Sequence, residues 1–204
     1  TRFGRQARES PRQNAEVDAL YRLAAAGVRV PKPYQFHEGV LLMELVTDEH
    51  GAAAPRLVDL EFTPDRARGL HQRLIGEVVR MLCAGVVHGD LSEYNILIGS
   101  DGPVIIDLPQ AVDAAGNNHA RRIFERDIAN LRDCFGRHAP ELVATDYGGE
   151  IWALFEAGTL RPDSALTGRF ERVDAAVDLA SVLQEIEDAR LEDAARRSRL
   201  QDVT

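Results

Sequence analysis

The sequence has few of the residues that build disulfide frameworks, metal clusters or membrane spans. Its two cysteines, Cys83 and Cys134, lie far apart, and neither has metal-ligand spacing around it. Since both fall in segments with helical spacing, we expect buried, free thiols in a reducing compartment. No apolar run approaches the ~18 residues that a membrane-spanning helix requires, and no secretory signal is recognisable. These absences favour a cytoplasmic protein without a membrane partner.

Positive charge is also scarce. Lys32 is the only lysine, and 24 basic residues stand against 33 acidic ones, giving a net charge of -9. This balance argues against a broad nucleic-acid or ribosome contact. A local cluster, Arg121, Arg122 and Arg126, could bind phosphate or RNA, but a solvated helix face is the simpler interpretation. With 45% hydrophobic and 28% charged residues, the chain is otherwise typical of a globular domain with a core.

Helix and strand signals alternate along the chain. Thr63 and Pro64 mark the start of the clearest helix, and Gly85 suits the position just after its end. Two apolar runs separated by Glu38-Gly39 predict a β-hairpin. The expected elements are a helix over 15–26, strands over 34–37 and 40–46, a helix over 64–84, short strands over 86–87, 96–98 and 104–106, and helices over 118–135, 141–155 and 170–200. This order indicates an α+β fold.

Three polar residues beside the short strands form a pattern that suits phosphoryl transfer. Asp90 and Asn95 lie in one loop, and Asp107 ends the apolar run over 104–106. Neighbouring strands would bring Asn95 and Asp107 to adjacent loop ends, where an amide oxygen and a carboxylate could hold Mg²⁺ on a nucleotide's phosphates. Asp90 would then be free to accept a hydroxyl proton. Each residue alone could be a plain turn or strand-end residue, but the joint spacing matches the catalytic and metal loops of kinases.

The same stretch closely resembles the RIO family of atypical protein kinases. The resemblance is carried by His-Gly-Asp-Leu-Ser-Glu-Tyr-Asn-Ile-Leu at 88–97 and by Ile-Ile-Asp-Leu-Pro-Gln-Ala-Val at 105–112. The residues that separate it from phosphotransferases of the aminoglycoside and choline type are Ser92, Tyr94 and Gln110. Towards the C-terminus the chain is similar mainly to a bacterial branch of the family.

The resemblance extends from about Glu16 to about Phe135. It implies an α+β, protein-kinase-like fold, mainly the C-terminal lobe plus the hinge, with the N-terminal lobe largely absent. Residues 1–46 would be a remnant of the N-terminal lobe, with a helix, a hairpin and the hinge. Residues 47–170 would be the C-terminal lobe with the catalytic and metal loops, and residues 171–204 a charged helical tail.

Carried over by position, the resemblance implies a serine/threonine kinase or ATPase that uses ATP and Mg²⁺, with Mn²⁺ as an alternative. Asp90 would be the catalytic aspartate and Asn95 and Asp107 the metal ligands, with Asp107 also a candidate phosphate acceptor. The other implied nucleotide contacts are the backbones of Glu44 and Val46 at the adenine, Met43 as gatekeeper, Leu97 and Ile106 as pocket walls, and Glu16 as partner of a phosphate-anchoring lysine. The protein substrate or regulated partner is not indicated.

That lysine and a glycine-rich phosphate loop are not in the chain. Lys32 lies between two prolines after the Glu16 helix, where the anchoring lysine cannot be. Because the chain opens at Thr1 without an initiator Met, we expect a longer natural protein that carries both features upstream; the alternative is a nucleotide site without a phosphate cradle. These 204 residues are expected to hold the catalytic residues in place but to turn over poorly. Gly89 replaces an arginine that senses activation-loop phosphorylation in many kinases, so that control is not expected.

Two other functions fit parts of the pattern. A nucleotide-sensing binding module, similar to a pseudokinase, would bind Mg-ATP and control a partner with negligible turnover. A small-molecule phosphotransferase of the same fold would phosphorylate a sugar, choline or an aminoglycoside, although Ser92 and Gln110 weigh against it. His88 is interpreted as a packed, hydrogen-bonded loop histidine rather than a catalytic base.

Overall fold

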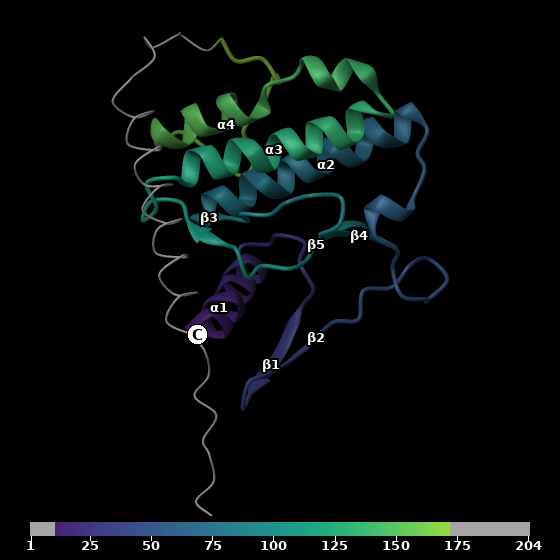
Figure 1. Ribbon diagram of the computed structural model, residues 1–204, viewed down its shortest axis with the longest axis vertical. Helices are drawn as coiled ribbons and strands as arrows, with labels where there is room; N and C mark the ends of the chain where they lie inside the picture. The colour runs from purple at the N-terminus through teal and green to yellow at the C-terminus, as the bar shows by residue number, and fades with distance from the viewer. Residues whose placement is uncertain (1–10, 172–204) are drawn as a thin grey trace, which may run out of the picture. The chain divides into compact units, whose positions relative to one another are not determined.

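Helices and short two-stranded sheets make up the described part of the chain (Figure 1). The structure is a computed structural model that describes residues 11–171, with side chains from Ala15 onward. Residues 11–170 belong to one compact unit. The predicted α+β class is confirmed. The helix predicted over 170–200 lies, beyond Glu171, outside the described residues, and the division of the chain near residue 46 stays a prediction.

The first elements are a helix and a hairpin, as predicted. Helix α1 (Pro11–Ala25) buries Leu20 and Leu23, and strands β1 (Pro33–His37) and β2 (Val40–Met43) pair in antiparallel register. Both residues of the connecting turn have positive φ, 49° at Glu38 and 79° at Gly39, as a two-residue hairpin turn requires. The expected strand over 40–46 was too long.

The second strand ends early because the main chain of the next residue, Glu44, pairs elsewhere. Its N–H donates to the Lys32 carbonyl at 2.9 Å, outside the regular ladder. The chain then forms an isolated antiparallel bridge between Thr47 and Ala53 and crosses to η1 (Leu57–Asp59). We use the term hinge for residues 43–46.

Three helices form the layer at the top of Figure 1, with α3 between α2 and α4 in that view. Helix α2 (Pro64–Cys83) begins at its predicted cap, Thr63, whose side chain accepts from the Arg66 N–H at 3.4 Å. Helix α3 (Ala120–Gly136) also lies within two residues of its predicted bounds.

The single helix expected over 141–155 was wrong. The segment divides into a 3-10 turn, η2 (Pro140–Ala144), and helix α4 (Tyr147–Glu156). The division has a local cause, because the Asp146 side chain caps a new helix by accepting from the Gly149 N–H at 3.0 Å.

Two small antiparallel pairs lie next to the helical layer. Strand β4 (Ile96–Gly99) pairs with β5 (Gly102–Ile105), which confirms the predicted pairing of these two runs. Strand β3 (Val86–Val87) pairs with β6 (Val112–Asp113), and β6 was not predicted because two residues carry no periodicity. None of the described helices is long and apolar enough to cross a membrane.

The core contains one of the two cysteines. Cys134 is buried as expected, whereas Cys83, the last residue of α2, is exposed, so the prediction of two buried thiols was wrong for Cys83. Both are free thiols. Cys83 is exposed because it is the last residue of α2 and does not lie on the apolar face, to which Leu82 belongs.

His71 is the polar exception inside this core. Only 2% of the residue is exposed, its ring lies 5.6 Å from those of Phe135 and Tyr147, and its Nε2 has no hydrogen-bond partner among the described residues. Burial lowers the pKa of His71 from 6.5 to about 4. The ring is therefore neutral in the folded protein at pH 7.

We expect His71→Leu to become more stable, relative to the unaltered protein, as the pH falls from 6.5 to 4. In that range the unfolded state binds a proton at His71 that the folded state refuses, so the unaltered protein loses up to about 3 kcal/mol and the variant does not. Urea unfolding at several pH values measures the difference, in which all other titrating groups cancel. A difference that stays constant with pH would contradict this assignment.

Candidate active site

The β4–β5 pair brings two of the predicted site residues together. Asn95 comes directly before β4, and Asp107 lies two residues after β5. Ile96 is opposite Ile105 in the ladder, and the Ile106 N–H donates to the Asn95 carbonyl at 3.0 Å. The two loop ends therefore meet, as the sequence predicted.

The Asn95 side chain is held in one orientation by Asp90. Its Nδ2 donates to the Asp90 carbonyl at 2.9 Å and to Asp90 Oδ2 at 3.3 Å. Both bonds use the amide nitrogen, so the amide oxygen stays available to a cation. The residue is buried, whereas Asp90 is exposed, which leaves its carboxylate accessible to a substrate.

His88 connects the loop of Asp90 to the strand of Asp107. Its Nε2 donates to the Ile106 carbonyl at 3.0 Å, and its Nδ1 accepts the Asp90 N–H at 3.2 Å. Burial lowers the pKa of His88, so the neutral ring with one donor and one acceptor is favoured. The interpretation of His88 as a packed loop histidine is confirmed, and its role is to fix the spacing of the two aspartates.

Asp127 of helix α3, which was not predicted from the sequence, holds the loop that carries Asp90. Its carboxylate is 2% exposed and accepts the N–H of Gly89 at 2.8 Å and of Leu91 at 3.3 Å. Burial raises the pKa of Asp127 to about 6, against the two N–H groups and Arg126, which lower it. A signal was present, because Asp127 interrupts the apolar stripe of α3 beside Ile128.

The arginines of the basic cluster on α3 interact with other groups of the protein, so the cluster is not a simply solvated helix face. Arg126 donates to the Gly89 carbonyl, so it supports the Asp90 loop beside Asp127. Arg121 pairs with Glu125 at 3.0 Å and with Glu156 at 3.5 Å. Two of the three arginines therefore have structural partners within this unit.

Gly89 is required by the close approach of another loop. Its φ is +87°, and a Cβ at this position would collide with the carbonyl oxygen of Gln110. The residue that stands in place of the arginine of many kinases is thus fixed by backbone geometry. No larger side chain fits without moving the loop between Asp107 and β6.

Replacement of Gly89 by alanine is expected to destabilise the protein by at least about 2 kcal/mol, because the left-handed conformation and the clash add. Gly69→Ala in α2 is the matched control: its Cβ meets nothing within 4 Å, and alanine should stabilise the helix by up to about 1 kcal/mol. Chemical denaturation compares the two. Equal stability of Gly89→Ala and the unaltered protein would show that the loop moves freely.

The backbone of Asp107 is unusual. Its φ is +69°, in the left-handed region that residues other than glycine seldom adopt. Such a conformation costs on the order of 1–3 kcal/mol and persists where the surroundings enforce it. Here the preceding residue, Ile106, is bonded on one side to Asn95 and on the other to His88. The exposed Asp107 carboxylate is thereby turned out of the strand direction.

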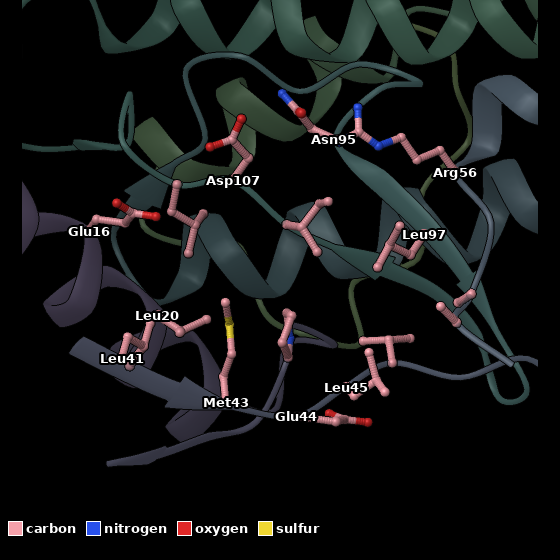
Figure 2. Close-up of a pocket in the computed structure, with 16 residues that line it drawn as sticks. Glu16, Leu20, Leu41, Met43, Glu44, Leu45, Arg56, Asn95, Leu97 and Asp107 are labelled. Carbon is pink, nitrogen blue, oxygen red and sulfur yellow. The ribbon is translucent and has the colours of Figure 1, made fainter. Parts of the chain in front are cut away.

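A pocket of about 410 Å³ opens beside these residues. Figure 2 shows Asn95 and Asp107 at one end and the hinge residues Met43, Glu44 and Leu45 at the other. The lining residues are Glu16, Leu20, Pro31, Leu41, Met43, Glu44, Leu45, Val46, Ala53, Ala54, Arg56, Asn95, Leu97, Ile106, Asp107 and Leu108. The lining is mostly apolar with polar groups at one end, as in small-molecule sites.

Of the nine site residues predicted from the sequence, eight line this one pocket, among them Glu16, Met43, Glu44, Val46, Leu97, Ile106 and Asp107. Asn95 lines it as well, whereas Asp90 lies outside the lining set and is tied to it through Asn95. Lys32 is also outside; its ammonium lies over the Tyr34 ring, 5.8 Å from the centroid. The structure thus brings the predicted set together, and their chemical roles stay predictions.

The Glu44 side chain fixes the hinge from behind. Its carboxylate accepts two hydrogen bonds from the Arg29 guanidinium, at 2.8 and 2.9 Å, and one from the Lys32 N–H at 3.0 Å. Arg29 holds the pKa of Glu44 below its usual value. The Arg29 N–H in turn donates to Glu77 of α2 at 2.9 Å. The Glu44 carboxylate is thereby engaged by Arg29 and Lys32, while Met43, Leu45 and Val46 add apolar side chains to the pocket lining.

The donor set at the polar end suits a hard cation. Among residues 11–171, no group of three or more His, Cys, Asp or Glu is arranged to hold a metal. Asn95 and Asp107 supply one amide oxygen and one carboxylate, and Mg²⁺ commonly binds through one or two such ligands plus water and phosphate oxygens. These two residues therefore fit a magnesium ion whose remaining ligands are water and phosphate oxygens.

Comparison of the chain with protein-family models and with curated proteins points to a single family. The family model described as "RIO domain" matches residues 3–147. The chain is 36% identical over 126 residues to the RIO-type serine/threonine-protein kinase Rio1 of Thermoplasma acidophilum, covering 62% of this chain and 64% of that protein. It is 39% identical over 137 residues to the protein of the same name in Haloferax volcanii, covering 62% and 42%.

A eukaryotic relative gives the same result. The chain is 37% identical over 126 residues to the serine/threonine-protein kinase rio1 of Schizosaccharomyces pombe, covering 60% of this chain and 24% of that protein. In all three cases the chain covers less than two thirds of the relative's length. These matches confirm the predicted family and, with the observed helices and sheets, the kinase-like α+β fold.

Proposed function

Since the chain belongs to the RIO domain family, we propose that it is an ATP- and Mg²⁺-dependent phosphotransferase, a serine/threonine kinase or ATPase with Asp90 as its catalytic aspartate. One observation carries the proposal: the Asn95 oxygen and Asp107 carboxylate lie together at the polar end of an apolar pocket. Named relatives are serine/threonine-protein kinases. The protein substrate and the cytoplasmic location stay predictions.

The apolar end suits the base of the nucleotide. Leu97 and Ile106 would form one wall against the adenine, with Met43 at the back of the pocket. The Glu44 carbonyl and the Val46 N–H would bond the adenine edge. Among the described residues, the main-chain hydrogen bonds at these two positions use the Glu44 N–H and the Val46 carbonyl instead. The two groups needed for adenine are therefore left open by the fold.

The polar end suits the phosphates. Asn95 and Asp107 would hold Mg²⁺, or Mn²⁺, which neutralises charge on the transferred phosphoryl group. Asp90, exposed and beside Asn95, would accept the proton of an attacking hydroxyl. Asp107 is also the candidate phosphate acceptor, in which case a carboxylate oxygen bonds to the γ-phosphorus as ADP leaves. Glu16 would pair with a phosphate-anchoring lysine.

A nucleotide-sensing module is the second candidate, and one observation favours it. Among the described residues no lysine lines the pocket, so Glu16 has no lysine partner there. Without a phosphate-anchoring lysine, binding of Mg-ATP can persist while turnover is slow. In this case the Mg-ATP-bound state would control a partner protein.

The test is phosphate transfer from γ-labelled ATP by the intact protein and by Asp107→Ala. We expect autophosphorylation or ATP hydrolysis that Asp107→Ala abolishes, and no transfer to sugars, choline or aminoglycosides. Tight Mg-ATP binding with negligible turnover would favour the sensing module. Rapid phosphorylation of a small molecule would instead establish a metabolite phosphotransferase.

A further inference from the structure

Arg56 is the one basic residue among the described residues that line the pocket. The other charged lining residues, Glu16, Glu44 and Asp107, are acidic. Glu44 is neutralised by Arg29. A polyphosphate that entered the pocket would therefore meet two carboxylates, those of Glu16 and Asp107, and one cation, Arg56.

The backbone of Arg56 is fixed beside the metal-binding end. Arg56 forms an antiparallel bridge with Leu97, and the Pro55 carbonyl accepts the Ile98 N–H at 2.9 Å. The Arg56 carbonyl accepts the Asp59 N–H at 3.1 Å. The side chain therefore starts from a rigid point next to β4, the strand that Asn95 precedes.

The guanidinium of Arg56 has no acidic partner within residues 11–171. Most other arginines of this region pair with carboxylates, such as Arg80 with Glu77 and Arg137 with Glu93. In Figure 2 the Arg56 side chain extends along the edge of the pocket toward the end where Asn95 lies, on the side away from Glu16. An exposed, unpaired guanidinium in that position is suited to an anion.

We propose that Arg56 binds the phosphates of the nucleotide from the C-terminal-lobe side of the pocket and determines its preference for phosphorylated over unphosphorylated nucleosides. This inference rests on the proposed function. A planar guanidinium can donate two parallel hydrogen bonds to phosphate oxygens, which a lysine at the same place cannot. Its charge also offsets the carboxylates at this end of the pocket.

The test measures affinities of ATP, ADP and adenosine for the intact protein, with Mg²⁺, by competition with a fluorescent adenine-site ligand so that weak binding is still measured. Arg56→Ala should weaken ATP and ADP about tenfold, the scale of one partly exposed charged hydrogen bond, and leave adenosine unchanged. Arg56→Lys should recover part of the loss, and the loss should shrink at high salt. Arg66→Ala is the matched control, since Arg66 lies over the Phe62 ring and not in the pocket.

Three results would overturn the inference. Equal weakening of ATP and adenosine would place the effect on the base, the ribose or the fold. Unchanged ATP affinity would remove Arg56 from the phosphate site, and a higher KM for a protein acceptor alone would assign it to that acceptor. If the unaltered protein does not bind Mg-ATP, the proposed function fails as well, so the two failures are distinguishable.

Discussion

Asp90→Asn is expected to lower phosphoryl transfer about a thousandfold while leaving ATP affinity nearly unchanged. A positioned general base contributes on the order of 10²–10⁴ to the rate, and asparagine cannot accept the proton. Asparagine keeps the shape, and its amide oxygen can still accept from Asn95. ATP affinity should persist because Asp90 is not among the residues that line the pocket. Steady-state hydrolysis and calorimetric titration of ATP give the two quantities.

A control variant separates catalysis from charge. Asp101→Asn removes the same charge from an exposed residue at the β4–β5 turn, outside the pocket, and should leave both quantities unchanged. If Asp90→Asn keeps its full turnover, Asp90 is not the catalytic residue. If neither protein turns over but both bind Mg-ATP tightly, the sensing module is the better description.

Asp127→Ala should have the largest effect on stability and also abolish activity. The substitution leaves the N–H groups of Gly89 and Leu91 without their acceptor, at about 1–3 kcal/mol for each buried donor. We expect a loss of about 3 kcal/mol in the free energy of unfolding. Turnover should fall more than ATP affinity, because the loop that carries Asp90 loses its anchor while the hinge is untouched.

The pH dependence of this loss has a definite sign. Since burial raises the pKa of Asp127 from 3.8 to about 6, the folded state holds a proton there more tightly than the unfolded state does. The contribution of Asp127 to stability is therefore full at low pH and is lost as the pH rises through 6. The destabilisation by Asp127→Ala should grow by up to about 3 kcal/mol between pH 7 and pH 4. Asp133→Ala, an exposed residue of the same helix paired with Arg132, is the control. A smaller loss at pH 4 than at pH 7 would contradict this assignment.

The sequence predicted those features whose signals are local. Helix α2 starts and ends where Thr63, Pro64 and Gly85 indicate, because caps and breakers act on adjacent backbone. The sequence also identified the three polar site residues, because they lie within 18 positions of one another in a loop and at a strand end: Asp90, Asn95 and Asp107. Asn95 and Asp107 come close together because the two consecutive apolar runs that form β4 and β5 pair with each other.

What the sequence did not predict depends on distant partners. Asp127 binds a loop 36 to 38 residues earlier in the chain, and no spacing rule connects them. Strand β2 ends early because the Glu44 N–H donates to the Lys32 carbonyl, and the Glu44 carboxylate accepts from Arg29; pattern alone reveals neither bond. Likewise, the need for glycine at 89 comes from Gln110 across the site. The sequence did not indicate Arg56 as a pocket residue, because the loop before η1 contains no recognisable motif.

We propose that Asn95 and Asp107 make a site for magnesium on ATP, and calorimetric titration of ATP with and without Mg²⁺ tests this site. We expect Mg²⁺ to raise ATP affinity by at least about tenfold, equivalent to about 1.4 kcal/mol. Asp107→Asn should remove most of that gain, whereas Asp101→Asn should keep it. ATP binding that is independent of Mg²⁺, or a gain that survives in Asp107→Asn, would contradict a magnesium site at Asp107.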